Sequence, residues 1–585
     1  MKKLKLIFYL SIFFSEAKGF SEEDSLQKAK IQIFTGKINF GISQYKGIKT
    51  PQRQNPFDIS VSGMPMIQYK NFQLPINFLF SNLSRKNQQP YNYLGLIPTF
   101  QWGRFYLGDT FIDYSPFTLN GHRIRGAGFD LYPGKHFRLG VMYGQMQRPI
   151  AENLTLLDNP ETYLFEQPFP AYKRMGYAIK LGFVIKDSSY IDLLLFKAKD
   201  QIGSIPVPSK KGIDGFETIT PAENLVIGTK FNIRLARKLF WTTDMAASVY
   251  TRDQTAAPLE VDLSENKFLS RIPKSAAKDL IQVNASTQIN YAAESVLSYW
   301  DSTFNFKLKF KQISPNYKSL GSYNFFYDTD IRKVNFMSTW QGMKGKMTMN
   351  SSLDYEKNNI KKSNFYTGET ILGLFELLYF PTQKFGAFLQ YSGTSSKQKP
   401  VSFSYNEYGS KSNLHNAAII GRYSFDNPRI YSLITFTGMY NFIQNQLVYE
   451  SIKTDTRFDI YTANLGYNLS LLKKGTTIDA GLWQVSMKDI TKKQQSNTGF
   501  SLGGTQSLLK NKAAVGANYS LFLNQYFDNN SGKTHQANIT LNYYILTGHR
   551  VWFRASYLNN KLEKVSLTEK SFSEFRTMIG YDFDL

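Results

Sequence analysis

The sequence predicts an all-β protein, a transmembrane antiparallel up-and-down β-barrel of about 26 strands within a range of about 22 to 28. Two observations predict it. Apolar and polar side chains alternate along most of the chain after Lys28, and the alternating segments are joined by connections that are short and long in turn. A period of two is the pattern of a β-strand, and this order of connections is typical of barrels with short periplasmic turns and long extracellular loops.

Residues 1–19 predict a secretory signal peptide. The basic start MKKLK precedes the apolar stretch LIFYLSIFF, and AKG then places small side chains before a cleavage point. The apolar stretch is too short to cross a membrane as a helix. The alternative is a buried N-terminal helix. We expect residues 20–28 to form a short periplasmic segment and residues 29–585 to form a single outer-membrane barrel domain.

The composition excludes several kinds of site. The chain has no cysteine, so disulfides, thiolate metal sites and a lipoprotein signal are excluded. A net charge of +24 can indicate nucleic-acid binding, but a secreted chain favours anionic lipid headgroups or an anion-attracting lumen, and we expect no nucleic acid. Part of the charge serves solubility. The 37 Tyr and 47 Phe residues suit the two aromatic girdles of a membrane barrel.

The segment FNFKLKFK (304–311) shows what the alternation implies. In a membrane barrel one face of this strand contacts lipid and the other faces the lumen. A lysine on the lipid face at the mid-plane costs about 2–4 kcal/mol, so Lys307, Lys309 and Lys311 are expected to form a basic ladder inside the lumen. Such a ladder requires acidic residues or anions opposite it. The side chains expected on the lipid face are Phe304, Phe306, Leu308 and Phe310.

The same alternation recurs elsewhere, in IQVNASTQINY (281–291), YTANLGYNLSL (461–471) and HQANITLNYYI (535–545). Short connections are expected at 70–71, Gly103, 133–135, 381–383, 426–428, 473–475 and 547–548. Long ones are expected at 148–173, 200–222, 253–280, 314–330, 395–413 and 444–458. The connection 292–302 breaks this order. A soluble propeller, β-helix or sandwich array is the alternative, but the sequence has neither a fixed repeat period nor domain linkers.

The C-terminal segment FRTMIGYDFDL (575–585) carries a resemblance of its own. Gly580, Tyr581, Phe583 and Leu585 resemble the last-strand signal read by the barrel-assembly machinery of Gram-negative bacteria. That signal usually ends in an aromatic residue and has a polar residue where Met578 stands. The resemblance implies assembly by that machinery, an outer-membrane location, and contact with outer-membrane lipid and lipopolysaccharide.

Two further stretches, 108–144 and ISPNYKSLGSYNFFYDTD (313–330), resemble large outer-membrane barrels of the Bacteroidota type. That resemblance implies either a nutrient channel or a subunit of a secretion or surface-assembly machine. Strand-like alternation starts near Lys30, which leaves no room for the plug of TonB-dependent transporters. The added periplasmic domain and cysteines of the lipopolysaccharide-inserting barrel are missing, as are the extra domains of ushers.

Motifs for metal binding and nucleophilic catalysis are missing from the sequence. The five histidines have no partner at metal-ligand spacing, and HExxH, CxxC and GxSxG do not occur. His122 could act with Asp109 or Asp113, but a rim histidine beside turn glycines is the simpler interpretation. We therefore expect no cofactor, no metal and no enzymatic activity.

Arg123, Arg125 and Arg138 form a local basic cluster in the sequence. Two roles are open for it. The cluster can bind an anionic substrate in the lumen, or it can pair with acidic residues as an internal ion network, which we favour. The acidic candidates are Asp109, Asp113 and Asp130.

A barrel of this strand number is wide, since barrels of about 16–18 strands already enclose an aqueous channel. An open hole of that size would make the membrane leak, so the lumen must be filled. The loops 148–173, 200–222 and 253–280 can fold inward, or another polypeptide can occupy the space. We therefore expect a pore or transport channel with a basic lumen narrowed by its own loops. The alternative is a barrel subunit of a secretion or surface-protein assembly complex, with a lumen-plugging or surface partner.

Overall fold

The structure is a computed structural model that describes twelve stretches of the chain, and the predicted signal peptide and periplasmic segment lie outside them. Among the described residues, no helix combines the length and apolar character that crossing a membrane requires. The described stretches are 34–48, 56–82, 92–151, 170–186, 188–208, 219–258, 280–322, 329–401, 408–449, 452–526, 531–562 and 571–584.

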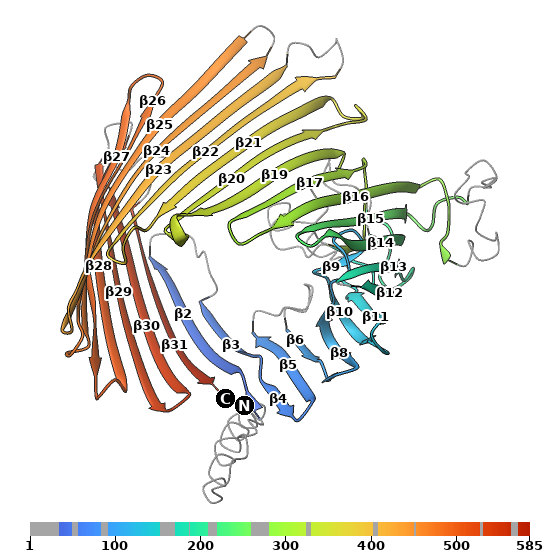
Figure 1. Cartoon of the computed structure of the whole chain (residues 1–585), viewed down its shortest axis with the longest axis horizontal. Helices are drawn as coiled ribbons and strands as arrows, with labels where there is room; N and C mark the ends of the chain where they lie inside the picture. The colour runs from blue at the N-terminus through green and yellow to red at the C-terminus, as the bar shows by residue number, and fades with distance from the viewer. Residues whose placement is uncertain are drawn as a thin grey trace, which may run out of the picture.

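One antiparallel sheet closes on itself and forms a barrel (Figure 1). Strand β2 (Lys37–Ile48) pairs with the last strand, β31 (Phe572–Asp584), over its full length. Three spans are interrupted along their length, so the 29 hydrogen-bonded segments of the sheet make 26 spans. The predicted fold class and strand number are confirmed.

The bounds of the elements are as follows. The first half of the barrel contains β1 (Phe34–Thr35), β2, β3 (Phe57–Gly63), β4 (Met66–Tyr69), β5 (Phe72–Ser81), β6 (Tyr93–Leu96), β7 (Thr99–Phe100), β8 (Gly103–Phe111), β10 (Arg123–Leu131), β11 (Phe137–Gln147), β12 (Arg174–Lys186), β13 (Ser189–Asp200), β14 (Glu223–Ala236), β15 (Leu239–Thr251), β16 (Thr287–Trp300) and β17 (Phe304–Ile313). The second half contains β19 (Ile331–Gly342), the 3-10 turn η5 (Met343–Gly345), β20 (Met347–Asn358), β21 (Tyr366–Tyr379), β22 (Phe385–Pro400), β23 (Gly409–Asp426), β24 (Ile430–Tyr449), β25 (Ile452–Leu471), β26 (Thr476–Asp489), β27 (Gln494–Leu508), β28 (Ala513–Gln525), β29 (Ser531–Leu546), β30 (His549–Leu562) and β31. Two short strands, β9 (Leu119–Asn120) and β18 (Gly321–Ser322), form a separate small sheet that is not part of the wall.

The connections at the two ends of the barrel differ in length. The end where β2 begins and β31 ends has tight turns throughout, such as 70–71, 133–136 and 547–548, and we call it the turn end. Most connections at the opposite end, the loop end, are longer. The order of short and long connections that the sequence predicted is therefore present in the structure.

The expected boundaries were wrong at four places. Strand β16 runs to Trp300 and leaves a tight turn where 292–302 was expected to be long, and it begins only at Thr287 rather than near 281. Strands β24 and β25 pair across most of 444–458, for example at Gln444↔Arg457. Apolar and polar side chains do not alternate regularly in this hairpin tip, where Leu447, Val448 and Tyr449 follow one another, yet its backbone groups still pair. Strands β22 and β23 likewise pair across both ends of 395–413, for example at Ser395↔Asn413, so β22 to β25 are longer than expected.

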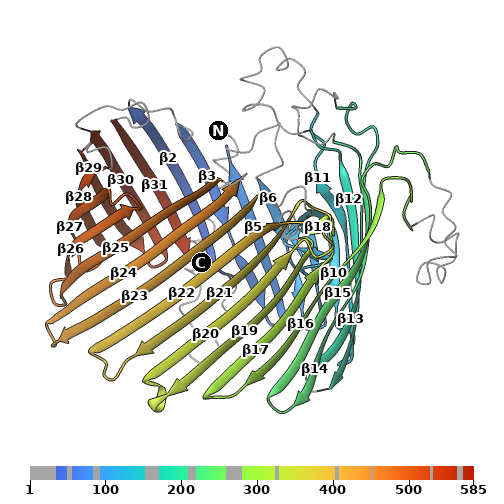
Figure 2. The same ribbon diagram turned by 90° about the horizontal axis from the view of Figure 1, so that it is seen from above.

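Large apolar side chains point outward from the barrel. Leu308, Phe336 and Leu353 lie opposite one another on β17, β19 and β20, and their exposed fractions are 44%, 41% and 55%. A water-soluble protein buries side chains of this size in its core. The outward face is therefore the apolar face. The strands that form the wall are tilted (Figure 2).

The buried core lies inside the barrel, where two connections fold against the inner wall of β10 to β17. The segment 112–122 contains β9 and the segment 314–322 contains β18, and Gly321 pairs in parallel with Leu119. Tyr317 donates a hydrogen bond of 2.6 Å to the carbonyl of Phe117, and their rings meet edge to face. These segments fill part of the lumen. Most of 148–173, 200–222 and 253–280, the loops expected to do so, lies outside the described residues.

The predicted C-terminal assembly signal lies on β31, the strand that closes the barrel by pairing with β2, and one of its residues is a glycine at a close contact. Gly580, Tyr581 and Phe583 pair with Gly41, Phe40 and Ile38 of β2, whereas Leu585 lies outside the described residues. The Trp552 ring packs directly over Gly580, where a Cβ atom would collide with it. The Trp552 indole N–H donates a hydrogen bond of 3.1 Å to Asp582 on the same strand as Gly580.

We expect Gly580→Ala to destabilise the barrel by about 1–3 kcal/mol, because the added methyl group overpacks the Trp552 ring. The guanidinium midpoint, read from heat-modifiable gel mobility, should fall. Gly373→Ala is the matched control, since a Cβ at Gly373 meets no atom within 4 Å. Equal midpoints for the two variants would contradict this account of the seam.

Candidate functional site: an arginine-lined pocket

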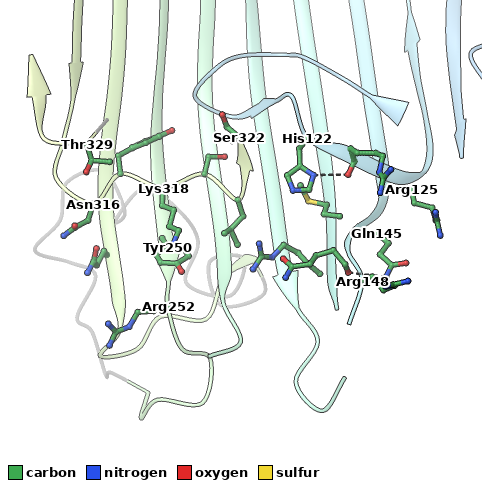
Figure 3. Close-up of a pocket in the computed structure, with 18 of the residues that line it drawn as sticks. His122, Arg125, Gln145, Arg148, Tyr250, Arg252, Asn316, Lys318, Ser322 and Thr329 are labelled. Atoms are coloured by element: carbon green, nitrogen blue, oxygen red, sulfur yellow. Dashed lines mark hydrogen bonds between the residues drawn. The ribbon is translucent and has the colours of Figure 1, made fainter. Parts of the chain in front are cut away.

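A pocket of about 600 Å³ lies at the loop end, between the inner wall and the inward segment 314–322. Cationic side chains dominate its lining, and Asp109 is the single carboxylate among the described residues that line it. Figure 3 shows these side chains gathered from separate strands. The cations are Arg123, Arg125, Arg148, Arg174, Arg252 and Lys318. We call this site the arginine pocket.

Arg174 and Arg252 reach the pocket from the lumen side of the wall. Arg174 has the same alternation on β12 as Ala178, which is fully buried in the interior core. Asp200 holds its guanidinium in a two-pronged ion pair with distances of 2.8 and 2.9 Å. Arg252 is the first residue after β15 and lies two positions beyond Tyr250. The ammonium group of Lys318 lies 5.0 Å from the centre of the Tyr250 ring.

Arg123 and Arg125 reach the pocket from the outward face of β10. They flank Ile124, which is fully buried in the interior core, so alternation along β10 points both arginines away from that core. Arg125 pairs with both carboxylate oxygens of Asp109, at 3.0 and 3.1 Å. The arginine pocket therefore extends across the loop-end edge of β10 and β11.

Arg138, the third member of the predicted cluster, lies elsewhere. It is near the turn end of β11, where it donates to Asp192 at 2.7 Å and lies 4.3 Å from the centre of the Tyr190 ring. Of the acidic candidates, Asp109 pairs with Arg125, and Asp130 pairs with Lys180 at 3.0 Å. The structure thus brings Arg123 and Arg125 together and places Arg138 apart. Anion binding by these arginines stays a prediction.

His122 lies at the edge of the pocket and adds no charge to it. The ring is buried, and Nδ1 lies 2.9 Å from the carbonyl oxygen of Arg123. Burial lowers the pKa of His122 to about 4, so the imidazole is neutral near pH 7. The Asp113 carboxylate accepts a hydrogen bond from the Gly121 N–H at 2.6 Å. Within the described stretches, no group of three His, Cys, Asp or Glu residues could hold a metal ion.

The basic ladder of β17 lies on the lumen side, because Lys307, Lys309 and Lys311 share their alternation with the fully buried Ile313. The ammonium group of Lys309 lies 3.8 Å from a carboxylate oxygen of Glu294 on β16. Lys307 lies 4.8 Å from the centre of the Trp300 ring. Acidic and aromatic side chains thus lie beside the ladder.

The next lysine on the inner wall repeats this arrangement. Lys333 on β19 lies 3.7 Å from Asp354 and 3.8 Å from Glu356, both on β20. Lys333 is the register partner of Lys311, so two neighbouring strands carry lysines and the strands on either side of them carry the acidic residues, which reduces the repulsion among the lysines.

Sequence reasoning missed four of the six cations of the arginine pocket. Arg148, Arg174, Arg252 and Lys318 are far apart in the chain, and no spacing links them. What they share is position, because each lies at or beyond the loop end of a strand. Strand boundaries exact to one residue would have been needed to use that signal.

No family model and no curated protein matches the chain. Solved structures match at low similarity. OccAB2 from Acinetobacter baumannii is 10% identical, with 68% of this chain and 98% of that one covered and a TM-score of 0.28. OpdK from Pseudomonas aeruginosa, solved with vanillate, is 8% identical, with 68% and 99% covered and a TM-score of 0.28. An anion-selective porin from Comamonas acidovorans is 12% identical, with 50% and 93% covered and a TM-score of 0.24. Scores this low carry no argument about this chain.

We expect Lys307→Glu with Lys309→Glu to shift ion selectivity towards cations, because the change reverses two charges on the inner wall. The reversal potential across a planar bilayer under a KCl gradient measures it. Lys473→Glu with Lys474→Glu, in the turn after β25, makes the same charge change away from the lumen and should leave selectivity unchanged. Failure of the first variant to show heat-modifiable mobility would mean that those lysines do not face water.

Proposed function

We propose that this chain is a non-enzymatic outer-membrane pore that admits small hydrophilic anions past the arginine pocket. The turn end would face the periplasm and the loop end the cell exterior, as in a Gram-negative outer membrane. Barrel-assembly machinery would insert it, and outer-membrane lipid and lipopolysaccharide would surround it. The apolar outward face and the charged inner wall support this placement.

The observation that carries the proposal is the charge of the arginine pocket. Six cations and one carboxylate line a space of about 600 Å³. Guanidinium groups match carboxylate and phosphate geometry and stay charged at every relevant pH. Clefts lined by one sign of charge raise the local concentration of ions of the opposite charge. A solute entering from the loop end would meet this pocket before the rest of the lumen.

The inward segments 112–122 and 314–322 support a narrowed channel. They are held in place by buried polar contacts as well as by packing. The Ser115 hydroxyl donates to Asp244 on β15 at 2.7 Å, and the Asn224 side chain accepts from the backbone N–H of Leu320 at 2.9 Å. These bonds fix the segments against the wall, so they would act as a permanent constriction rather than a mobile lid.

The alternative, a barrel subunit of a multi-protein secretion or surface-assembly complex, is favoured by the long strands β22 to β25. Strand β24 has 20 residues, which at about 3.3 Å each and a tilt of about 45° span about 47 Å along the barrel axis. The apolar band of a membrane barrel is about 25 Å tall. This part of the wall would project beyond the membrane and offer a polar surface to a partner protein.

Purified protein in a planar bilayer should give steady conductance that favours anions. Arg252→Glu with Lys318→Glu should reduce or reverse that preference, because it exchanges two cations of the pocket for anions. Lys453→Glu, at the exposed tip of β25 on another part of the wall, should leave the preference unchanged.

The same preparation separates the two functions. A bilayer that stays silent, together with stoichiometric co-purification of another subunit after mild detergent extraction, would overturn the pore and support the complex subunit.

A further inference from the structure

Three prolines interrupt the wall between β3 and β8 along one line. Pro65 separates β3 from β4, Pro75 lies within β5, and Pro98 separates β6 from β7. Hydrogen bonds show that they are neighbours across the sheet, since Ile76 N–H donates to the Pro65 carbonyl at 2.9 Å and Ile97 N–H donates to the Pro75 carbonyl at 3.0 Å. Proline has no N–H, so each one removes a bond from the ladder.

Pairing is sparse above this line. Within the described residues, β6 pairs with β5 only over Ile76–Leu79 and with β8 only at Gly95 and Leu96. By contrast, β24 pairs with β25 along its whole length. Separating β6 from β8 would therefore break few backbone hydrogen bonds among the described residues, whereas separating β24 from β25 would break many.

The turn end of the same wall is held by an aromatic cluster. Phe100 packs on Phe72 with ring centres 5.0 Å apart and on Trp102 at 5.2 Å, and Phe105 packs on Trp102 at 5.8 Å. Below the proline line, β5, β7 and β8 are thus fastened together. Any separation would begin at the loop-end half, with the proline line as the hinge.

Asp109 latches the loop-end half. Its carboxylate accepts a hydrogen bond from the Leu94 N–H of β6 at 3.3 Å while it pairs with Arg125 of β10. One carboxylate therefore ties the weakly paired strand to the firmly paired wall. The same carboxylate is the single acidic group in the lining of the arginine pocket.

We propose that the loop-end half of the wall at β6 forms a lateral portal between the lumen and the bilayer, and that it passes amphipathic anions. The anionic head group of such a molecule would occupy the arginine pocket and compete with Asp109 for Arg125. Loss of that pair would loosen the Asp109 latch on β6, and the apolar tail would then pass between β6 and β8. This inference rests on the proposed membrane location but not on ion conduction.

The first test measures opening. In nanodiscs, amide hydrogen exchange at Tyr93–Leu96 should be at least about tenfold faster than in the middle of β24, and Asp109→Asn should accelerate it about tenfold further, because a charge-assisted bond is lost. Exchange at β6 as slow as in β24 would overturn the portal. Heat-modifiable mobility of the Asp109→Asn variant checks that it is folded.

The second test measures passage and uses the natural lack of cysteine. Leu96→Cys with Leu107→Cys joins register partners on β6 and β8, the two strands that the Asp109 latch holds together, and locks the portal, whereas Leu433→Cys with Asn468→Cys joins β24 to β25 as the matched control. Nanodiscs carry a diazirine on the acyl chain of phosphatidylglycerol, of a free fatty acid or of phosphatidylcholine. After irradiation, mass spectrometry locates the labelled peptides.

We expect the two anionic probes to label the inward segment 112–122, whose Pro116 is exposed inside the barrel. The locked portal should lose that label by at least about tenfold, and the control disulfide should keep it. Labelling by phosphatidylglycerol alone, or by fatty acid alone, identifies which amphiphile passes. Labels confined to outward-facing peptides with all probes, or equal labelling in the locked protein, would overturn the proposal whether or not the protein conducts ions.

Discussion

The pairing of β2 with β31 is the constraint on which the rest of the structure depends. It joins the first and last strands of the described wall, from Lys37↔Asp584 to Ile48↔Ser573, and leaves the sheet without an edge. A closed sheet satisfies its backbone groups internally, which is the condition for exposing an apolar face to hydrocarbon. Once the sheet is closed, alternation along each strand assigns every side chain to the outside or the lumen. Gly580 lies on the seam strand β31 and admits the ring of Trp552, which packs over it from the neighbouring strand β30.

Closing so many strands creates an interior too wide for side chains to fill. Among the described residues, segments 112–122 and 314–322 fill one side of this interior and build a small core against β10 to β17. Tyr317 and Phe117 are at its centre, and Ser115 is bonded to Asp244 of the wall. This packing fixes the backbone that carries Lys318, and the neighbouring strand ends carry Arg174 and Arg252. The arginine pocket is thus a consequence of how the lumen is filled.

The sequence predicted the parts of this fold that are local. Alternation around Lys307 and Lys309 gave the two faces of β17, and the spacing of turns gave the strand number. It failed where a local pattern was missing, as at Gln444 and Arg457, whose hairpin has no regular alternation but is paired by its backbone. The sequence also did not predict the arginine pocket, because Arg252 comes close to the other cations only when strands distant in the chain are brought together in the barrel. Most of the fold was therefore predictable, and most of the site was not.

The unevenness of the wall connects these observations. Prolines are costly in a sheet interior, yet Pro65, Pro75 and Pro98 lie beside one another across the sheet, where β6 is held to β8 by few ladder bonds. A barrel needing only rigidity would place such breaks on different levels, where intact neighbours could compensate for each. Here they coincide, the aromatic cluster fastens one end, and Asp109 fastens the other from within the arginine pocket. Charge in that pocket and cohesion of the wall therefore depend on the same carboxylate.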